Sequence, residues 1–285
     1  MPLADDCPIP DPLELLSYLA AATERIVLGT GVLVLPEHNP VLLAKRLATL
    51  DVLSGGRARL GVGVGWLREE AEAVGIDPAT RGARSDEMIE ALRVLWREDE
   101  PTFHGDLFSF ERAMCRPRPL QSGGVPIHVG GHSPAAARRA GRFGDGYHPL
   151  GLDEELLRAR LAQLRTAALA ADRDADRIEL TLGGLLERTD AASVEAAAQA
   201  GADRLVLSTT TADPEELGAQ LAACRGAGGS RSGLTTPGRA GPGARAACPY
   251  RGPAATRGRR DAVAARGAGV DRRGWRRRRG PAMLN

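Results

Sequence analysis

The run of residues best suited to binding a flat ligand lies between positions 57 and 70. It reads R-A-R-L-G-V-G-V-G-W-L-R-E-E, with glycine at every second position, at Gly61, Gly63 and Gly65. Alternate residues of a strand share one face, so a neighbouring element or a flat ligand must come close to the backbone there. The strand ends at Trp66, before a charged, helix-like segment, and active sites of parallel α/β proteins lie at such ends. Trp66 and Glu69 are therefore candidate site residues.

A second candidate site is the sequence Gly130-Gly131-His132-Ser133-Pro134, where a predicted strand passes into a predicted helix. Backbone N–H groups at the start of a helix point outward and, with the helix dipole, attract an anion. This junction predicts a phosphate-binding loop. The alternative is a tight glycine turn followed by an ordinary Ser133 helix cap.

Several polar side chains follow strands, and each has two open interpretations. His148 lies at a strand end in G-D-G-Y-H-P. It is either a catalytic acid or base or a hydrogen-bonded structural histidine. Trp66 either stacks on a cofactor or covers the end of the sheet, and Glu69 faces either the pocket or water. Glu37 and His38 lie at the same rim. These residues identify no single proton donor, so the catalytic residues stay unknown.

The elements that must position these residues alternate between strand and helix. Residues typical of helix ends support this assignment, for example Asn39-Pro40 before a helix and Gly55-Gly56 after it. Strands are predicted at residues 25–35, 57–65, 126–131, 144–150, 178–186 and 204–208, and a hairpin at 102–110. Helices are predicted at residues 11–24, 39–54, 85–96, 133–143, 153–171 and 193–200, with a last one from 213.

Six consecutive strand–helix units predict an α/β fold with a parallel sheet and right-handed crossovers. Such a sheet is either an open doubly wound sheet or part of an eight-stranded barrel. A dinucleotide-binding fold would need G-x-G-x-x-G opening a helix, whereas Gly61, Gly63 and Gly65 are spaced by two inside a strand. The spacing favours the barrel. The predicted helix 11–24 precedes the first predicted strand, which indicates that an earlier strand is missing.

Composition narrows the class of protein. The chain has 285 residues, of which 43% are apolar, enough for one sizeable core. It has no apolar run long enough for a membrane span and no visible secretory signal, so we expect a cytoplasmic protein without a membrane partner. Its four cysteines are far apart, which fits a reducing compartment and predicts neither disulfides nor a metal site.

Two segments are predicted, a folded domain at residues 1–225 and a tail at 226–285. The tail has 14 arginines and 13 glycines but few core-forming residues, so we expect it to be disordered and dispensable. A basic arm for nucleic acid is the alternative interpretation. The tail lacks the repeated interleaving of aromatic residues with basic ones that single-stranded nucleic-acid binders use, so no nucleic-acid partner is expected.

Three segments carry a family resemblance. They read A-A-T-E-R-I-V-L-G-T-G-V-L-V-L-P-E-H-N-P, L-A-T-L-D-V-L-S-G-G-R-A-R-L-G-V-G-V-G-W and P-I-H-V-G-G-H-S-P-A-A-A-R-R-A-G-R-F-G-D-G-Y. Residues 9–224 resemble the luciferase-like monooxygenase superfamily, especially its branch of coenzyme F420-dependent oxidoreductases. The resemblance implies a (β/α)8 TIM barrel of the bacterial luciferase-like type. The present strands would be its third to eighth, and its first two strands, with the family's catalytic histidine, would be lacking.

The resemblance also implies a cofactor site. The phosphate of coenzyme F420, or of FMN as the alternative, would bind at Gly130, Gly131, His132 and Ser133. The step from Gly31 to Val32 would carry a non-prolyl cis peptide and a bulge that supports the flavin ring beside Gly63.

Three alternative functions are expected, of which the resemblance implies the first two. The first is hydride transfer between the reduced deazaflavin and a small organic substrate. The second is an FMN-dependent monooxygenase. The third is an inactive relic without cofactor. Family members commonly pair through helices beside the second and third barrel strands, so a homodimer is also expected.

Overall fold

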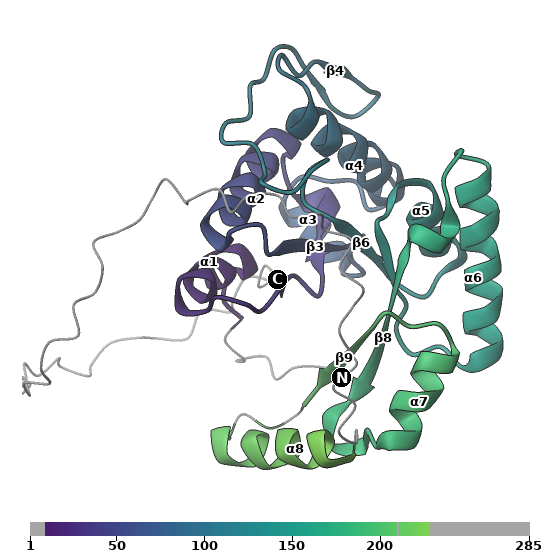
Figure 1. The fold of residues 1–285 in the computed structure, drawn as a ribbon. Coiled ribbons are helices and arrows are strands. Elements are labelled where there is room, and N and C mark those ends of the chain that lie inside the picture. Colours follow the sequence, from purple (N-terminus) through teal and green to yellow (C-terminus); the bar gives the residue numbers. More distant parts are fainter. Residues whose placement is uncertain (1–8, 210, 212, 228–285) are drawn as a thin grey trace, which may run out of the picture.

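The computed structural model describes residues 9–209, 211 and 213–227. These residues form a curled parallel sheet with helices around its outer face, and together they make up part of a barrel (Figure 1). The predicted tail at 226–285 lies outside the described residues from position 228 onward. The last helix ends at Ala227, two residues past the predicted boundary.

The sheet has the strand order β1–β3–β6–β7–β8–β9, and β2 also pairs with β3. The strands are β1 (Leu28–Gly29), β2 (Leu33–Val34), β3 (Ala58–Gly63), β6 (Ile127–Gly130), β7 (Gly146–His148), β8 (Glu179–Leu185) and β9 (Arg204–Ser208). All their pairings are parallel. The expected alternation of parallel strands and helices is confirmed.

Helices connect these strands. They are α1 (Pro12–Ala22), α2 (Pro40–Ser54), α3 (Arg68–Ala73), α4 (Arg81–Arg97), α5 (Pro134–Phe143), α6 (Glu154–Leu169), α7 (Ala191–Gln199) and α8 (Pro214–Ala227). Short 3-10 turns lie at Leu35–Glu37, Ala175–Arg177 and Leu186–Arg188. The predicted hairpin is confirmed as β4 (Phe103–His104) paired antiparallel with β5 (Ser109–Phe110).

Local sequence signals account for the helix ends. The Asn39 side chain accepts hydrogen bonds from the N–H groups of Val41 (3.0 Å) and Leu42 (3.2 Å), and Pro40 is the first residue of α2. Gly55 ends this helix at φ 69°, a conformation that favours glycine. Ser133 caps α5 in the same manner, through the N–H of Ala136 at 3.1 Å. Local sequence signals therefore determine where these helices begin and end.

The first predicted strand, residues 25–35, is interrupted. Gly29 pairs with Arg59 and Leu33 with Val62, so four steps along the first strand match three along β3. The extra residue forms a bulge between β1 and β2. The peptide bond between Gly31 and Val32 is cis, as the family resemblance implied.

The core lies between the sheet and the helices α1, α2, α4 and α5. Fully buried side chains from strands meet those from helices there, among them Leu60, Ile127, Leu47, Leu92 and Leu95. Packing is looser at the other end of the sheet, where α7 buries none of its residues. The sheet is therefore held most firmly on the β3–β6 side, where the candidate site begins.

Candidate functional site

A cavity of about 330 Å³ lies on the inner, concave face of the sheet. It is lined by residues of the β1–β2 bulge and of every other strand in the sheet. They are Val27, Gly29, Thr30, Gly31, Val32, Arg59, Gly61, His128, His148, Leu150, Thr181, Gly183, Arg204, Val206 and Ser208. Ligand sites of barrels of this kind lie at the carboxyl ends of the strands. The cavity reaches this end at Val32, Leu150 and Ser208.

The Val32 side chain forms a platform across two neighbouring strands. Its Cγ2 atom lies 2.7 Å from the position that a Cβ on Gly63 would take, and its Cγ1 atom lies 2.8 Å from the same point on Gly130. A larger residue at Gly63 or Gly130 would therefore collide with Val32. Val32 itself remains 39% exposed, and a Cβ on Gly31 would meet nothing within 4 Å. The bulge thus presents an open apolar surface to the cavity.

The bare glycine face of β3 has a structural cause as well. A side chain at Gly61 would run into the carbonyl oxygen of Thr30, whose hydroxyl donates to the Gly61 carbonyl at 2.6 Å. Gly65, at φ 74°, similarly leaves room for Val34. Of the two explanations that the sequence left open, a neighbouring element accounts for these glycines directly. Val32, and not a ligand, fills the space beside Gly63 and Gly130.

The predicted phosphate loop lies beside the platform. The N–H of Gly131, a residue with φ 116°, already donates to the carbonyl of His148 at 3.1 Å. In the part of the chain that is described, the N–H groups of His132, Ser133 and Ala135 have no hydrogen-bond partner, and they surround the start of α5. Arg160 donates to the His132 carbonyl at 2.8 Å and adds a positive charge nearby.

The other predicted residues are spread along the rim. His148 lines the cavity, and its buried Nε2 atom has no hydrogen-bond partner among the described residues. Burial, assisted by the charge of Arg204, lowers the pKa of His148, so its imidazole is neutral at pH 7. Trp66 is 81% exposed and Glu69 is exposed. Neither belongs to the residues that line the cavity.

A buried carboxylate at the rim was not predicted from the sequence. Glu70, next to the predicted Glu69, is only 3% exposed. Burial and the nearby Glu70 charge raise the pKa of Glu37, so the two acids lie close together. The available signal was the position of Glu70 in α3, one residue after Glu69. Neighbouring helix residues point in different directions, and a residue of α3 that faces the sheet is buried. His38, also predicted at this rim, has its pKa lowered by burial.

A charged cluster inside the curl of the sheet was not predicted from the sequence either. Arg59 of β3 donates to Glu179 of β8 at 2.8 Å, and Arg204 of β9 donates to the same carboxylate oxygen at 3.0 Å. The Nε2 atom of His128 on β6 lies 3.0 Å from Arg59. β3, β8 and β9 are largely apolar runs that each carry one charged residue, and these isolated charges were the available signal for an inward-facing polar layer.

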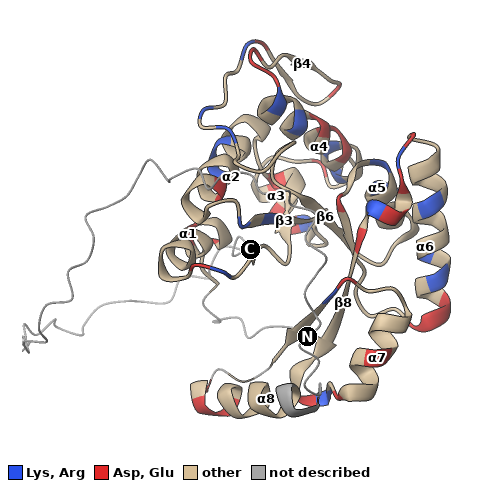
Figure 2. Cartoon of the chain, viewed as in Figure 1, with Lys and Arg blue, Asp and Glu red and all other residues tan. Residues whose placement is uncertain are grey.

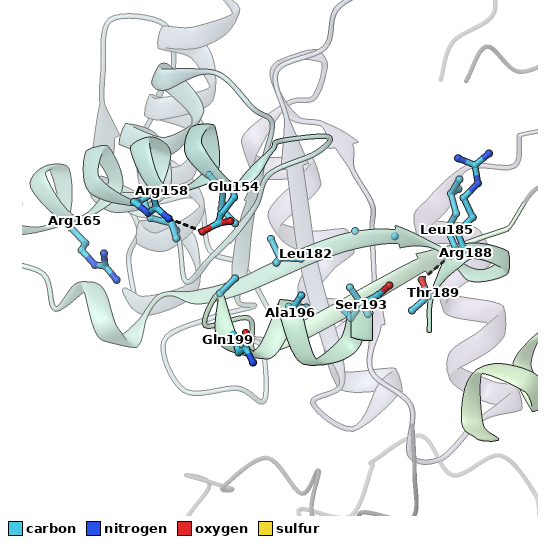
Figure 3. A pocket seen from close by; sticks show the side chains of 17 residues that line it. Glu154, Arg158, Arg165, Leu182, Leu185, Arg188, Thr189, Ser193, Ala196 and Gln199 are labelled. Carbon is cyan, nitrogen blue, oxygen red and sulfur yellow. Dashed lines mark hydrogen bonds and ion pairs between the residues drawn. The ribbon is translucent and has the colours of Figure 1, made fainter. Parts of the chain in front are cut away.

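A second cavity, of about 780 Å³, lies on the outer side of the sheet between α6 and α7 (Figure 3). Leu182 and Leu205 contribute to its wall, and Glu154 and Arg158 pair with each other at 2.6 Å on its rim. It is larger than the inner cavity but lies between the sheet and its covering helices. Among the strand ends it includes only that of β8, at Gly184 and Leu185, whereas the inner cavity is lined by the β1–β2 bulge and by every other strand around the curl. Its size therefore does not make it the candidate site.

Fold and cavity together define a parallel βα barrel-type protein with a candidate ligand site on the concave face of its sheet. The chain belongs to the family described as luciferase-like monooxygenase, whose model matches residues 3–277. Members of this family are oxidoreductases and monooxygenases.

Individual relatives agree with this membership. An FMNH(2)-dependent dimethylsulfone monooxygenase of Pseudomonas putida is 37% identical over 155 residues, which are 53% of this chain and 42% of the relative. The crystal structure of monooxygenase RslO1 from Streptomyces bottropensis is 31% identical, with a TM-score of 0.55, and the match covers 76% of this chain and 64% of that one. The chain spans about half the length of the curated relatives it matches.

A second solved structure shares the fold at lower identity. It is an F420-dependent secondary alcohol dehydrogenase in complex with an F420-acetone adduct. The TM-score is 0.65 at 20% identity, and the match covers 74% of this chain and 82% of that chain.

No helix among the described residues is both long and apolar enough to cross a membrane. Within the same residues, no cluster of three or more His, Cys, Asp or Glu side chains is arranged to hold a metal ion.

Proposed function

We propose that the protein is a coenzyme F420-dependent oxidoreductase that acts on a small organic substrate. The observation that carries this proposal is the Val32 platform, which is exposed toward the cavity and held in place by the absence of side chains at Gly63 and Gly130. A flat ring needs an apolar support of this kind, and nothing at Gly31 would obstruct it. When bound, the reduced deazaflavin supplies a hydride.

The chain's own groups fit the rest of such a cofactor. The N–H groups of His132, Ser133 and Ala135 at the start of α5 would hold the phosphate, supported by the helix dipole. The Gly131 N–H would not take part, because it binds the His148 carbonyl. In this proposal the predicted site residues Gly130 and Gly131 act as spacers that bring the loop to the platform.

His148 is the residue best placed to hold a proton. Its Nε2 atom is unpartnered among the described residues, and its neutral ring can accept a proton from a substrate or return it. Val32, Leu150 and Val206 exclude water from one side of the same cavity. Trp66 and Glu69 receive no role in this account because they lie outside the cavity.

The second candidate function is an FMN-dependent monooxygenase. The 37% identity to an FMNH(2)-dependent monooxygenase favours it. Both cofactors combine a flat tricyclic ring with a phosphate, so the platform and the α5 loop suit either one. The proposed site is thus the same in both functions, and only the reaction differs.

A homodimer is proposed as the assembled form. Exposed apolar side chains gather on the outer faces of α1 and α2, where Tyr18 is 73% and Leu42 is 66% exposed. Pairing through these helices would cover them. Light scattering of the wild type and of Tyr18→Glu measures this directly, and a monomeric wild type contradicts it.

Fluorescence titration of the full chain with coenzyme F420 and with FMN tests the proposed function. Tighter binding of coenzyme F420 supports the oxidoreductase. Binding of FMN alone replaces it with the monooxygenase. Absence of binding by both cofactors to a folded protein contradicts both functions and leaves the relic interpretation.

A further inference from the structure

The charged cluster inside the curl of the sheet has an unbalanced charge. Arg59 and Arg204 both donate to one carboxylate oxygen of Glu179, and Arg204 also donates to the Thr181 hydroxyl at 3.3 Å. Figure 2 shows charged residues on the strands as well as on the outer helices. Two guanidinium groups face a single carboxylate.

The nearby histidines do not change this balance. Burial, and after it the charge of Arg59, lowers the pKa of His128 to about 4, so its imidazole is neutral at pH 7. With a neutral ring, Nε2 accepts the hydrogen bond from Arg59 at 3.0 Å. His148 is neutral as well. The cluster keeps a surplus of one positive charge on a face that is only partly open to water.

The arginines also have donors to spare. Each guanidinium carries five N–H donors. Among the described residues, Nε and Nη2 of Arg59 and Nε of Arg204 have no hydrogen-bond partner. Side chains of both arginines are about one quarter to one third exposed, at 26% and 33%, and both line the 330 Å³ cavity. Unpartnered guanidinium donors and a surplus positive charge therefore lie beside the open space of this cavity.

The rest of the cavity wall is largely apolar. Val27, Val32, Leu150 and Val206 line it together with the two arginines. Two half-buried cations that share one carboxylate are incompletely neutralised, and a second carboxylate offers the planar pair of oxygens that a guanidinium binds best.

We propose that this cavity binds a small carboxylate with an apolar body, whose carboxylate pairs with Arg59 and Arg204 while its body contacts the valine and leucine side chains. The site differs from the phosphate position at the start of α5, which uses His132, Ser133 and Ala135. Its apolar wall shares Val32 with the proposed ring position. Binding of the carboxylate needs no cofactor, so the site can be tested in the protein without one.

Calorimetric titration of the full chain tests this site with benzoate, acetate and benzamide, at an ionic strength held constant with chloride. Benzoate should bind at least tenfold more tightly than acetate because only benzoate fills the apolar wall. Benzamide, which has the same shape without the charge, should bind at least tenfold more weakly than benzoate. Equal binding of benzamide and benzoate overturns the proposal.

Variants separate the site from general attraction of anions. Arg204→Gln should weaken benzoate binding at least tenfold, whereas Arg165→Gln, the same charge change on the outer helix α6, should leave it unchanged. Glu179→Gln should tighten binding several-fold, because it raises the surplus from one positive charge to two.

Circular dichroism establishes that each variant is folded, and Arg59→Gln replaces Arg204→Gln if the latter does not fold. Equal losses in Arg204→Gln and Arg165→Gln, or weaker binding by folded Glu179→Gln, overturn the proposal.

Discussion

Val32 occupies the space that a side chain at Gly63 would need: its Cγ2 atom lies 2.7 Å from the position of a Cβ there. The bulge, the cis peptide and the bare face of β3 are therefore parts of one arrangement. Gly63 contributes to the proposed site by leaving room for Val32, and it need not touch a ligand itself.

Gly63→Ala should lower the free energy of unfolding by about 1–3 kcal/mol, the usual cost of an overpacked contact. Val32→Ala in the same chain should recover most of this loss, because it removes the colliding methyl groups. Urea unfolding of the two single variants and the double variant measures the coupling. Additive losses in the double variant would show that Val32 and Gly63 do not compete for space. Gly218→Ala, on an exposed face of α8, is the control and should be neutral or slightly stabilising.

Asp51→Ala should cost about 3 kcal/mol of stability, because it leaves buried donors unpaired. The Asp51 side chain is fully buried and accepts from the N–H of Leu120 at 2.7 Å and from the amide of Gln121 at 2.7 Å. It thereby ties the segment before β6 to α2. Asp99→Ala is a matched control, since this 85% exposed carboxylate pairs with Arg116 and Arg118 of the same segment. Its loss should cost less than about 1 kcal/mol, and equal costs in the two variants would contradict this account.

Stability should fall as the pH drops from about 6.5 toward 4 because of His128. Its pKa is about 4 in the folded protein, against 6.5 for a free imidazole. Between these values the unfolded chain binds more protons than the folded one, so the free energy of unfolding rises with pH. The contribution is complete above pH 6.5 and is on the order of 3 kcal/mol.

Urea unfolding at pH 7 and pH 5 measures this contribution in the wild type and in His128→Gln, which should flatten the dependence. His104→Gln, at a 61% exposed side chain, should leave the dependence unchanged. An unaltered slope in His128→Gln would refute the assignment.

Ala135→Glu should weaken cofactor binding while leaving the fold intact. Ala135 is an exposed residue in the first turn of α5, where a carboxylate interacts favourably with the helix dipole. The same carboxylate would repel a phosphate held by the neighbouring N–H groups. We expect at least a tenfold loss of affinity, about 1.4 kcal/mol. Ala135→Gln has a similar size without the charge and should bind nearly as the wild type does. Equal affinities for both variants would place the phosphate elsewhere.

Much of the fold was predictable because local signals mark it. Asn39, Gly55 and Ser133 act at helix ends through contacts with residues only a few positions away. The strand–helix alternation follows from apolar periodicity and these caps. The interruption of the first strand was less predictable from residue types, since the bulge depends on how Val32 packs across two other strands.

The site was only partly predictable for the same reason. The Gly131 N–H donates a hydrogen bond to the carbonyl of His148, a residue on the next strand. This bond determines which N–H groups at the α5 loop are free. The pairing of Arg59 and Arg204 with Glu179 joins three strands that are far apart in sequence. Long-range contacts of this kind leave no spacing pattern in the chain.

The most direct test of the central claim is a titration of the full chain and its Val32→Glu variant with the cofactor that the wild type prefers. A charged side chain on the platform should repel a flat apolar ring, so we predict at least a tenfold loss of affinity. Leu169→Glu, the same kind of change at a 78% exposed position on α6, should bind as the wild type does. Unchanged affinity in a folded Val32→Glu variant would contradict the claim that the ring lies on Val32.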